Sequence, residues 1–300
     1  MVSAVIRQLR PRSRASRVVM VTALGWAASA VFHIGVFAVD GGSLSGAVSW
    51  RKPIVFSISI SLTLWAVGWV LDRMPTVRPR LAGAIAWVFA VASTIETALI
   101  VLQTWRGRAS HFNVFEPGDA AIFGLMGIGI IVMSAALLTL FVWTLVERPA
   151  DAATRWAVIG GMAAIIAGLG IGQWLVDLGF QHVARFGAVP EVVTNGDAVA
   201  KFPHAVSFHG IQLFALLLAM ADGAGSDATR RATVMRVAVT GYLGLLTFAT
   251  IQSVAGLAPL ALRPWSIALI AASVAALGWA TATVARAARR SRHVPVTLRA

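Results

Sequence analysis

Three ionisable side chains stand inside otherwise apolar stretches of this sequence: His33, Glu96 and His209. Two histidines on different helices are suitable axial ligands for a haem b group. Two histidines and one carboxylate form a ligand set that non-haem iron prefers, and zinc accepts the same donor atoms. No His-Glu-x-x-His motif is present, so the metal hypothesis requires residues far apart in the sequence to come together.

A second set of polar residues is expected to surround the first and to contact a substrate or its headgroup. Its members are Arg106, Arg108, His111, Gln173, Asp177, His204, Gln212 and Gln252. Arginine binds phosphate and carboxylate through paired N–H donors, so Arg106 and Arg108 are candidates for holding an acidic headgroup. Counting from the expected helix ends puts several residues about 6–11 Å below one membrane surface. These are His33, Glu96, Gln173, His209 and Gln252.

Three functions could use such a polar layer. The principal hypothesis is a haem-binding or metal-binding site with a redox or enzymatic role. The second is a proton-coupled transporter of a small molecule, because a carboxyl group such as Glu96 within a membrane is typical of proton pathways. The third is a metal-free enzyme that acts on a lipid or isoprenoid, with Glu96 and His209 as its acid–base pair.

Each residue also has a purely structural interpretation. A single histidine within a membrane can serve only as a hydrogen-bonding group between helices, and Glu96 can be a protonated structural carboxyl. Arg106 and Arg108 can bind ordinary lipid headgroups. The run Gly168-Leu169-Gly170-Ile171-Gly172 superficially resembles a phosphate-binding loop, but no strand precedes it, so it predicts close helix packing instead.

The composition places these residues in a membrane. Of the 300 residues, 58% are hydrophobic and 12% are charged, whereas about a quarter are charged in a typical soluble domain. The absence of cysteine excludes disulfides, thiolate metal sites and covalent haem attachment. A net charge of +13 could suggest nucleic acid, but basic residues at membrane edges explain it, and no nucleic-acid partner is expected.

Eight apolar stretches are long enough to cross a bilayer, which takes about 20 helical residues. The sequence therefore predicts an all-α integral membrane protein in contact with the lipid bilayer, with an amphipathic small molecule as its possible further partner. The expected spans are 18–39, 53–71, 81–103, 119–146, 155–178, 204–222, 233–256 and 264–288.

The distribution of Lys and Arg predicts the orientation. In the alternating topology, 18 of these residues lie on the side of both termini and seven lie on the other side, which favours cytoplasmic termini and the cell inner (cytoplasmic) membrane. The expected organisation is a basic tail (1–17), a transmembrane domain (18–288) and a second basic tail (289–300). A cleaved signal peptide is the alternative for the start, since Ala28-Ser29-Ala30 resembles a cleavage site. The apolar run nevertheless continues through Val39.

The two halves of the domain, about 18–148 and 155–288, show weak internal similarity. Lys52-Pro53 opens the second span and Lys201-Phe202-Pro203 opens the sixth. Thr94-Ile95-Glu96 in the third span matches Thr250-Ile251-Gln252 in the seventh. We therefore expect a parallel repeat of four helices plus four, related by an axis along the membrane normal.

Overall fold

The computed structural model describes residues 2–74 and 78–292, and helices form most of it. The first half contains α1 (Val2–Leu9), α2 (Arg14–Asp40), α3 (Arg51–Leu71), α4 (Pro79–Trp105) and α5 (Pro117–Val146). The second half contains α6 (Ala152–Phe186), β1 (Thr194–Asn195), β2 (Ala198–Val199), α7 (Lys201–Gly223), α8 (Ala228–Val254) and α9 (Pro264–Arg292).

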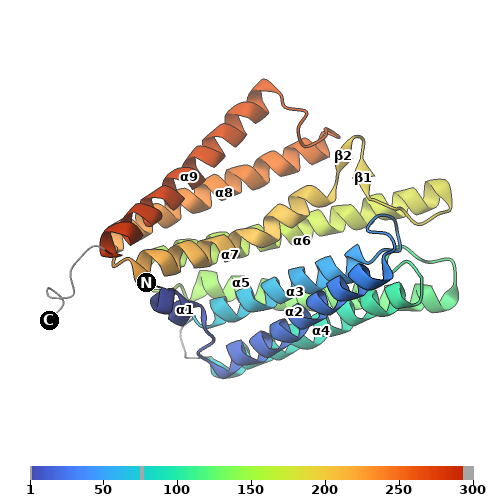
Figure 1. Cartoon of the computed structure of the whole chain (residues 1–300), viewed down its shortest axis with the longest axis horizontal. Helices are drawn as coiled ribbons and strands as arrows, with labels where there is room; N and C mark the ends of the chain where they lie inside the picture. The colour runs from blue at the N-terminus through green and yellow to red at the C-terminus, as the bar shows by residue number, and fades with distance from the viewer. Residues whose placement is uncertain (1, 75–77, 293–300) are drawn as a thin grey trace.

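Within the described residues, the eight helices α2 to α9 are long and apolar enough to cross a membrane. The chain is therefore an integral multi-pass membrane protein, as the sequence predicts. Helix α1 and the C-terminal end of α9 lie at one end of the bundle, which we call the terminal end, and the β1–β2 hairpin lies at the opposite, distal end (Figure 1). The loops 41–50, 106–116, 187–200 and 255–263 form the distal end. The cytoplasmic orientation of the termini stays a prediction.

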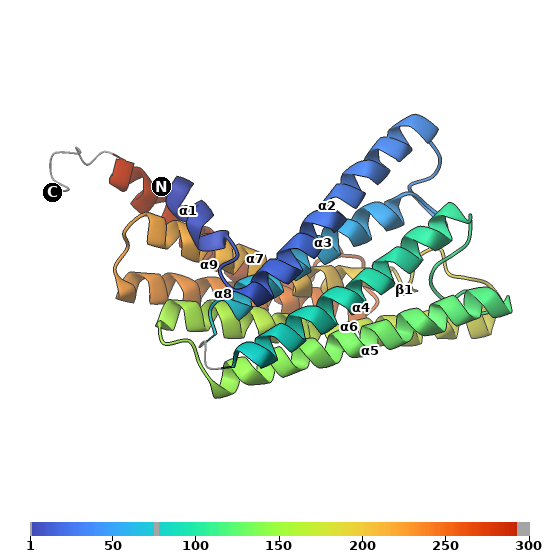
Figure 2. The same cartoon turned by 90° about the horizontal axis from the view of Figure 1, so that it is seen from below.

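The helices pack as two groups of four. In the first group, α2 contacts α3 and α4, α4 also contacts α3, and α5 packs on α4. The second group repeats these pairings, since α6 contacts α7 and α8, α8 also contacts α7, and α9 packs on α8. The groups meet where α3 contacts α7 and where α5 contacts α6 (Figure 2).

Small residues let the helices approach closely, because lipid supplies no hydrophobic force between them. A Cβ atom at Gly161 of α6 would lie 2.7 Å from Cγ1 of Ile211 on α7. A Cβ atom at Gly168 would lie 2.7 Å from the Phe208 ring, whereas Gly170 has open space around it. The glycine run thus serves helix packing at Gly168 and not at Gly170.

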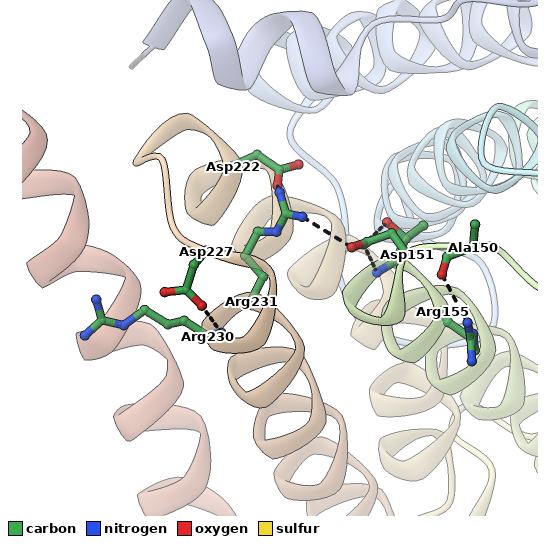
Figure 3. A network of polar contacts seen from close by, with 8 residues as sticks. Ala150, Asp151, Arg155, Asp222, Asp227, Arg230 and Arg231 are labelled. Atoms are coloured by element: carbon green, nitrogen blue, oxygen red, sulfur yellow. Dashed lines mark hydrogen bonds and ion pairs between the residues drawn. The ribbon is translucent and has the colours of Figure 1, made fainter.

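Carboxylates organise the helix ends at the terminal end of the bundle. Asp151 caps α6 by accepting the Thr154 backbone N–H, and Asp227 caps α8 in the same way. Arg231 forms ion pairs with Asp222 at 2.6 Å and with Asp151 at 3.3 Å (Figure 3). The Arg231 guanidinium thereby joins the ends of α6, α7 and α8.

The described elements differ from the expected ones in three places. Helix α6 continues past the expected end at 178, through Gly179, to Phe186. No proline intervenes, and the helix ends at Gly187, which adopts the left-handed conformation. The short helix α1 occupies part of the expected basic tail, and the expected loop between the fifth and sixth spans contains the β1–β2 hairpin. Residues 293–300 of the expected C-terminal tail lie outside the described residues.

The glycine contacts generate a stability prediction. Gly168→Ala is expected to destabilise the protein by about 1–3 kcal/mol, because the new methyl group overlaps Ser207 and Phe208. Gly170→Ala, two residues along the same helix, is the matched control and should be neutral or slightly stabilising. Thermal unfolding of both purified variants in one detergent measures the difference, and equal melting temperatures would contradict the packing described.

Candidate functional site

His33 lies at the distal end of α2 and is 3% exposed. Its Nδ1–H donates to the Ser29 carbonyl at 2.7 Å, and its Nε2 accepts the indole N–H of Trp105 at 3.1 Å. The rings of Trp50 and Trp105 pack beside it, each with its centroid 6.2 Å away. Both ring nitrogens are thus occupied, which is the structural role of an interhelical hydrogen bonder.

Glu96 lies within α4 and is 3% exposed. Its Oε2 atom is buried and has no hydrogen-bond partner in the described part of the chain. A Cβ atom at Gly129 of α5 would lie 3.4 Å from this oxygen, so the carboxyl group packs against the α5 backbone. The neighbouring Thr97 hydroxyl is also buried without a partner.

The structure does not gather the three principal candidates into one cluster. Across residues 2–74 and 78–292, no three His, Asp or Glu side chains lie close enough to hold a metal ion together. His33 meets α4 at Trp105, nine residues and about 13 Å of helix rise beyond Glu96. No hydrogen bond or ion pair joins Glu96 to His209 among the described residues.

Arg106 and Arg108 surround a buried carboxylate that orders the 106–116 loop. Asp119, in the first turn of α5, is 2% exposed and accepts N–H groups from Gln103 at 3.0 Å and from Asn113 at 3.0 Å. Arg106 completes the set with an ion pair at 3.1 Å. Arg106 therefore holds its own loop in place.

Gln252 has the same kind of role at the end of α8. Its Nε2 donates to the carbonyls of Ala258 and Ala261, at 2.8 Å and 2.9 Å, and so fastens the 255–263 loop. Gln103 likewise donates to the carbonyl six residues further on, that of Ala109. In its contacts Gln252 resembles Gln103 rather than Glu96, which changes the residue pairing expected for a repeat.

Three other expected site residues have partners of their own. Gln173 donates to Asp177 at 3.0 Å, and both side chains are exposed on α6. His204 at the start of α7 donates its Nδ1–H to the Gly168 carbonyl at 3.0 Å. These contacts place Gln173 and Asp177 on the surface and use His204 to bind α7 to α6.

Gln212 and His209 lie where the two helix groups meet. Gln212 of α7 donates through Nε2 to the Leu62 carbonyl of α3 at 3.2 Å, while its Oε1 is buried with no partner among the described residues. His209 precedes it by three residues and therefore shares its helix face. The His209 imidazole is half-buried, and in the part of the chain described it has no hydrogen bond.

His111 and Phe112 fill the space above this junction. The His111 ring packs on Phe56 of α3, with centroids 5.4 Å apart. Phe112 packs with Ala200, next to the start of α7, and lies so close to Gly179 that a side chain there would overlap its ring. Phe112 holds a positive φ of 59°, a conformation that costs energy for a bulky residue and often accompanies a functional site.

Two lysines lie beside His111, one from each helix group. Lys52 is in the first turn of α3 and Lys201 is in the first turn of α7, and both act electrostatically on the His111 ring. Burial and these two charges lower the pKa of His111 below its ordinary value, so the ring is neutral at neutral pH. We call Lys52, His111, Lys201, His209 and Gln212 the junction site, which is elongated and follows α7 for about 16 Å of helix rise from Lys201 to Gln212.

Sequence reasoning singled out three of these five residues and used Lys52 and Lys201 only as landmarks of the repeat. The composition distinguishes Lys52 and Lys201 from the other basic residues. The chain has 25 Lys and Arg residues, of which only Lys52 and Lys201 are lysines. The sequence marks Asp119 only as the first residue of the expected span 119–146, because nothing local in the sequence reveals that Gln103 and Asn113 converge on it.

No protein-family model matches the chain, and neither the curated proteins nor the solved structures contain a significant match.

The Asp119 cluster predicts how the 106–116 loop responds to mutation. Asp119→Ala removes the acceptor shared by Gln103, Arg106 and Asn113, so the loop should loosen and trypsin should cut faster after Arg106 and Arg108. Glu116→Ala, an exposed change in the same loop, is the control and should leave cleavage unchanged. Timed proteolysis in detergent with peptide mapping measures both, and equal cleavage rates would show that Asp119 does not order the loop.

Proposed function

We propose that the protein binds an amphipathic small molecule from the membrane at the junction site, and that His209 exchanges a proton with it. This is the metal-free enzymatic hypothesis, with its acid–base group on α7 and without Glu96 as its partner. The observation that carries the proposal is the unpaired imidazole of His209 at the contact between the two helix groups.

His209 differs from the other intramembrane histidines in what its ring is free to do. His33 uses both ring nitrogens, and His204 uses Nδ1 to bind the Gly168 carbonyl. An imidazole without a structural partner can donate or accept a proton near neutral pH, provided that a substrate reaches it. Gln212, one turn deeper on the same face, has a free amide oxygen that can orient such a substrate.

The residues around His209 suit a molecule with a polar head and an apolar body. The polar groups of the junction site lie toward the distal ends of α3 and α7, and Phe56 adds an aromatic surface beside them. Ligand sites of this kind combine mostly apolar walls with a few polar groups that fix orientation. The paired contact patterns of the two helix groups and the similar roles of Gln103 and Gln252 support a four-plus-four repeat. In such a repeat, the α3–α7 contact lies at the axis that relates the two helix groups.

The haem b and iron or zinc hypotheses stay predictions. The two hydrogen bonds of His33 count against this residue as an axial or metal ligand, because a ligating nitrogen must give up its present partner. His209 alone among the three expected ligands is unpaired and half-exposed in the described structure.

The proposed binding place can be mapped by photolabelling. A fatty alcohol that carries a diazirine, added to the protein in phosphatidylcholine nanodiscs, should label peptides of α3 and α7 around Phe56 and His209. His209→Trp is expected to reduce this labelling several-fold by filling the space beside Gln212. Val274→Trp, an exposed position on α9, is the control. Labelling spread equally over α9, which also presents exposed apolar residues, would contradict a specific site.

A second candidate function is proton coupling through Glu96, and its buried, unpaired Oε2 atom favours it. An isolated carboxylate is costly in a membrane interior, so we propose that Glu96 holds a proton there.

This protonated carboxyl should react with dicyclohexylcarbodiimide, which partitions into membranes and modifies neutral carboxyl groups. Peptide mass spectrometry is expected to find the adduct on Glu96 and to lose it in Glu96→Gln. Asp119 is the internal control, because it is buried as a carboxylate paired with Arg106 and should stay unmodified. Modification of Asp119 with an unreacted Glu96 would overturn this assignment.

A further inference from the structure

The two lysines of the chain lie at equivalent places and come together. Lys52 is the second residue of α3, and Lys201 is the first residue of α7. The interval from Lys52 to Lys201 equals the interval from Gln103 to Gln252. Since α3 contacts α7, the two ammonium groups act on each other, on Arg51 and on His111. The contact between the helix groups therefore brings Arg51, Lys52 and Lys201 near enough to repel one another.

This cluster has no carboxylate to balance it. In the part of the chain that the structure describes, the ion pairs are Arg78–Glu147, Arg106–Asp119, Arg231–Asp151 and Arg231–Asp222, and no acid pairs with Arg51, Lys52 or Lys201. The terminal end shows the opposite arrangement, because Arg231 there lies between two aspartates (Figure 3). Like charges that converge without a counterion raise the free energy of the folded protein unless an anion binds.

The helix starts add to the positive field. The N-terminus of a helix carries a partial positive charge, and acidic groups are the favourable ones there. Both α3 and α7 instead have a lysine in the first turn, and their N-cap residues, Trp50 and Ala200, provide no side-chain hydrogen bond to the first turn. The positive helix ends and the ammonium groups favour the same kind of ligand, namely an anion.

The neighbouring residues leave Lys52 and Lys201 accessible, and His111 provides a further hydrogen-bond donor. Lys201 is exposed and Lys52 is half-buried, so a ligand can reach both. The Ser110 hydroxyl lies 2.9 Å from Nδ1 of the neutral His111 ring, and donation to this atom leaves Nε2–H free to donate. The Phe56 and Phe112 rings fix the His111 side chain between the two helix starts.

We propose that Lys52, Lys201 and His111 bind the acidic headgroup, a carboxylate or a phosphate, of an amphipathic molecule whose apolar body lies along the α3–α7 contact. The inference rests on the proposed function and names the chemical class of its ligand. Each ammonium group donates hydrogen bonds to the anionic oxygens, and these charge-assisted bonds are about twice as strong as neutral ones. Phe56, one turn below Lys52, meets the first carbons of the apolar body.

The presence of just two lysines makes the test direct. Sulfosuccinimidyl acetate acetylates Lys52, Lys201 and the N-terminal amine, and peptide mass spectrometry follows each rate separately. In phosphatidylcholine nanodiscs, oleate is expected to slow acetylation of both lysines together and to leave the N-terminal amine unaffected. Oleyl alcohol has the same chain without the charge and should protect neither lysine. Inorganic phosphate and acetate at the same concentration should protect much less, because they lack the apolar body.

The variants test the charge itself. Lys52→Gln and Lys201→Gln are each expected to weaken the protection of the remaining lysine by oleate about tenfold, the effect of losing one charge-assisted contact. Lys52→Arg should retain most of the binding, measured as protection of Lys201, and shows that a variant at this position folds. Arg263→Gln removes one positive charge elsewhere at the distal end and should change nothing.

The outcomes separate this inference from the proposed function. Equal protection by oleate and oleyl alcohol, with photolabelling still confined to the junction site, would overturn the acidic headgroup and leave amphiphile binding intact. Equal protection by oleate and inorganic phosphate would overturn the amphipathic ligand. Lack of protection by every probe, together with photolabelling spread over all helices, would overturn both proposals.

Discussion

The structure depends on the high cost of leaving a polar group unpaired inside a membrane. Most polar side chains in the bundle meet this constraint locally. His33 binds Ser29 and Trp105, His204 binds the Gly168 carbonyl, and Asp119 collects three N–H donors. These groups hold helices and loops together, and because their hydrogen bonds are already made, they are not available to react with a ligand. The described residues that violate the constraint are therefore the informative ones.

Glu96 and the junction site are two of the places where buried polar atoms lack a partner among the described residues, and their chemistry differs. Glu96 faces the α5 backbone at Gly129, where its neutral form costs least, and it has no charged group beside it. The junction site instead combines the unpaired groups of His209 and Gln212 with uncompensated lysines. A single carboxyl group can carry a proton alone. Several unpaired groups with different polarity, gathered from both helix groups, match the needs of a ligand that has more than one chemical part.

The sequence was sufficient to predict the helices and insufficient to predict which side chains contact one another between them. Hydrophobic length predicted all eight spans, because crossing a bilayer requires a long apolar run whatever the neighbouring helices are. The common depth of His33, Glu96 and His209 did not imply a common cluster, because depth fixes one coordinate and leaves the direction around each helix open. Trp105 shows the difficulty. It reaches His33 from α4, and no pattern in either segment predicts that contact. The glycine run could be interpreted correctly, since a missing strand was enough to reject a phosphate loop.

The contact between α3 and α7 explains why the lysines matter although neither belongs to a recognisable motif. A lysine at the start of one transmembrane helix would ordinarily extend its ammonium group into water at the membrane surface. Here the helices that contact each other across the two groups, α3 and α7, each have a lysine in the first turn. Both lysine charges therefore act on His111. The backbone strain at Phe112 and the tight fit against Gly179 hold this arrangement rigidly, because the ring cannot withdraw without breaking its contacts with Phe123 and Phe180. A rigid scaffold that holds like charges near each other is the condition under which a bound anion would contribute most to stability. Binding of such an anion would also strengthen the contact between the two helix groups.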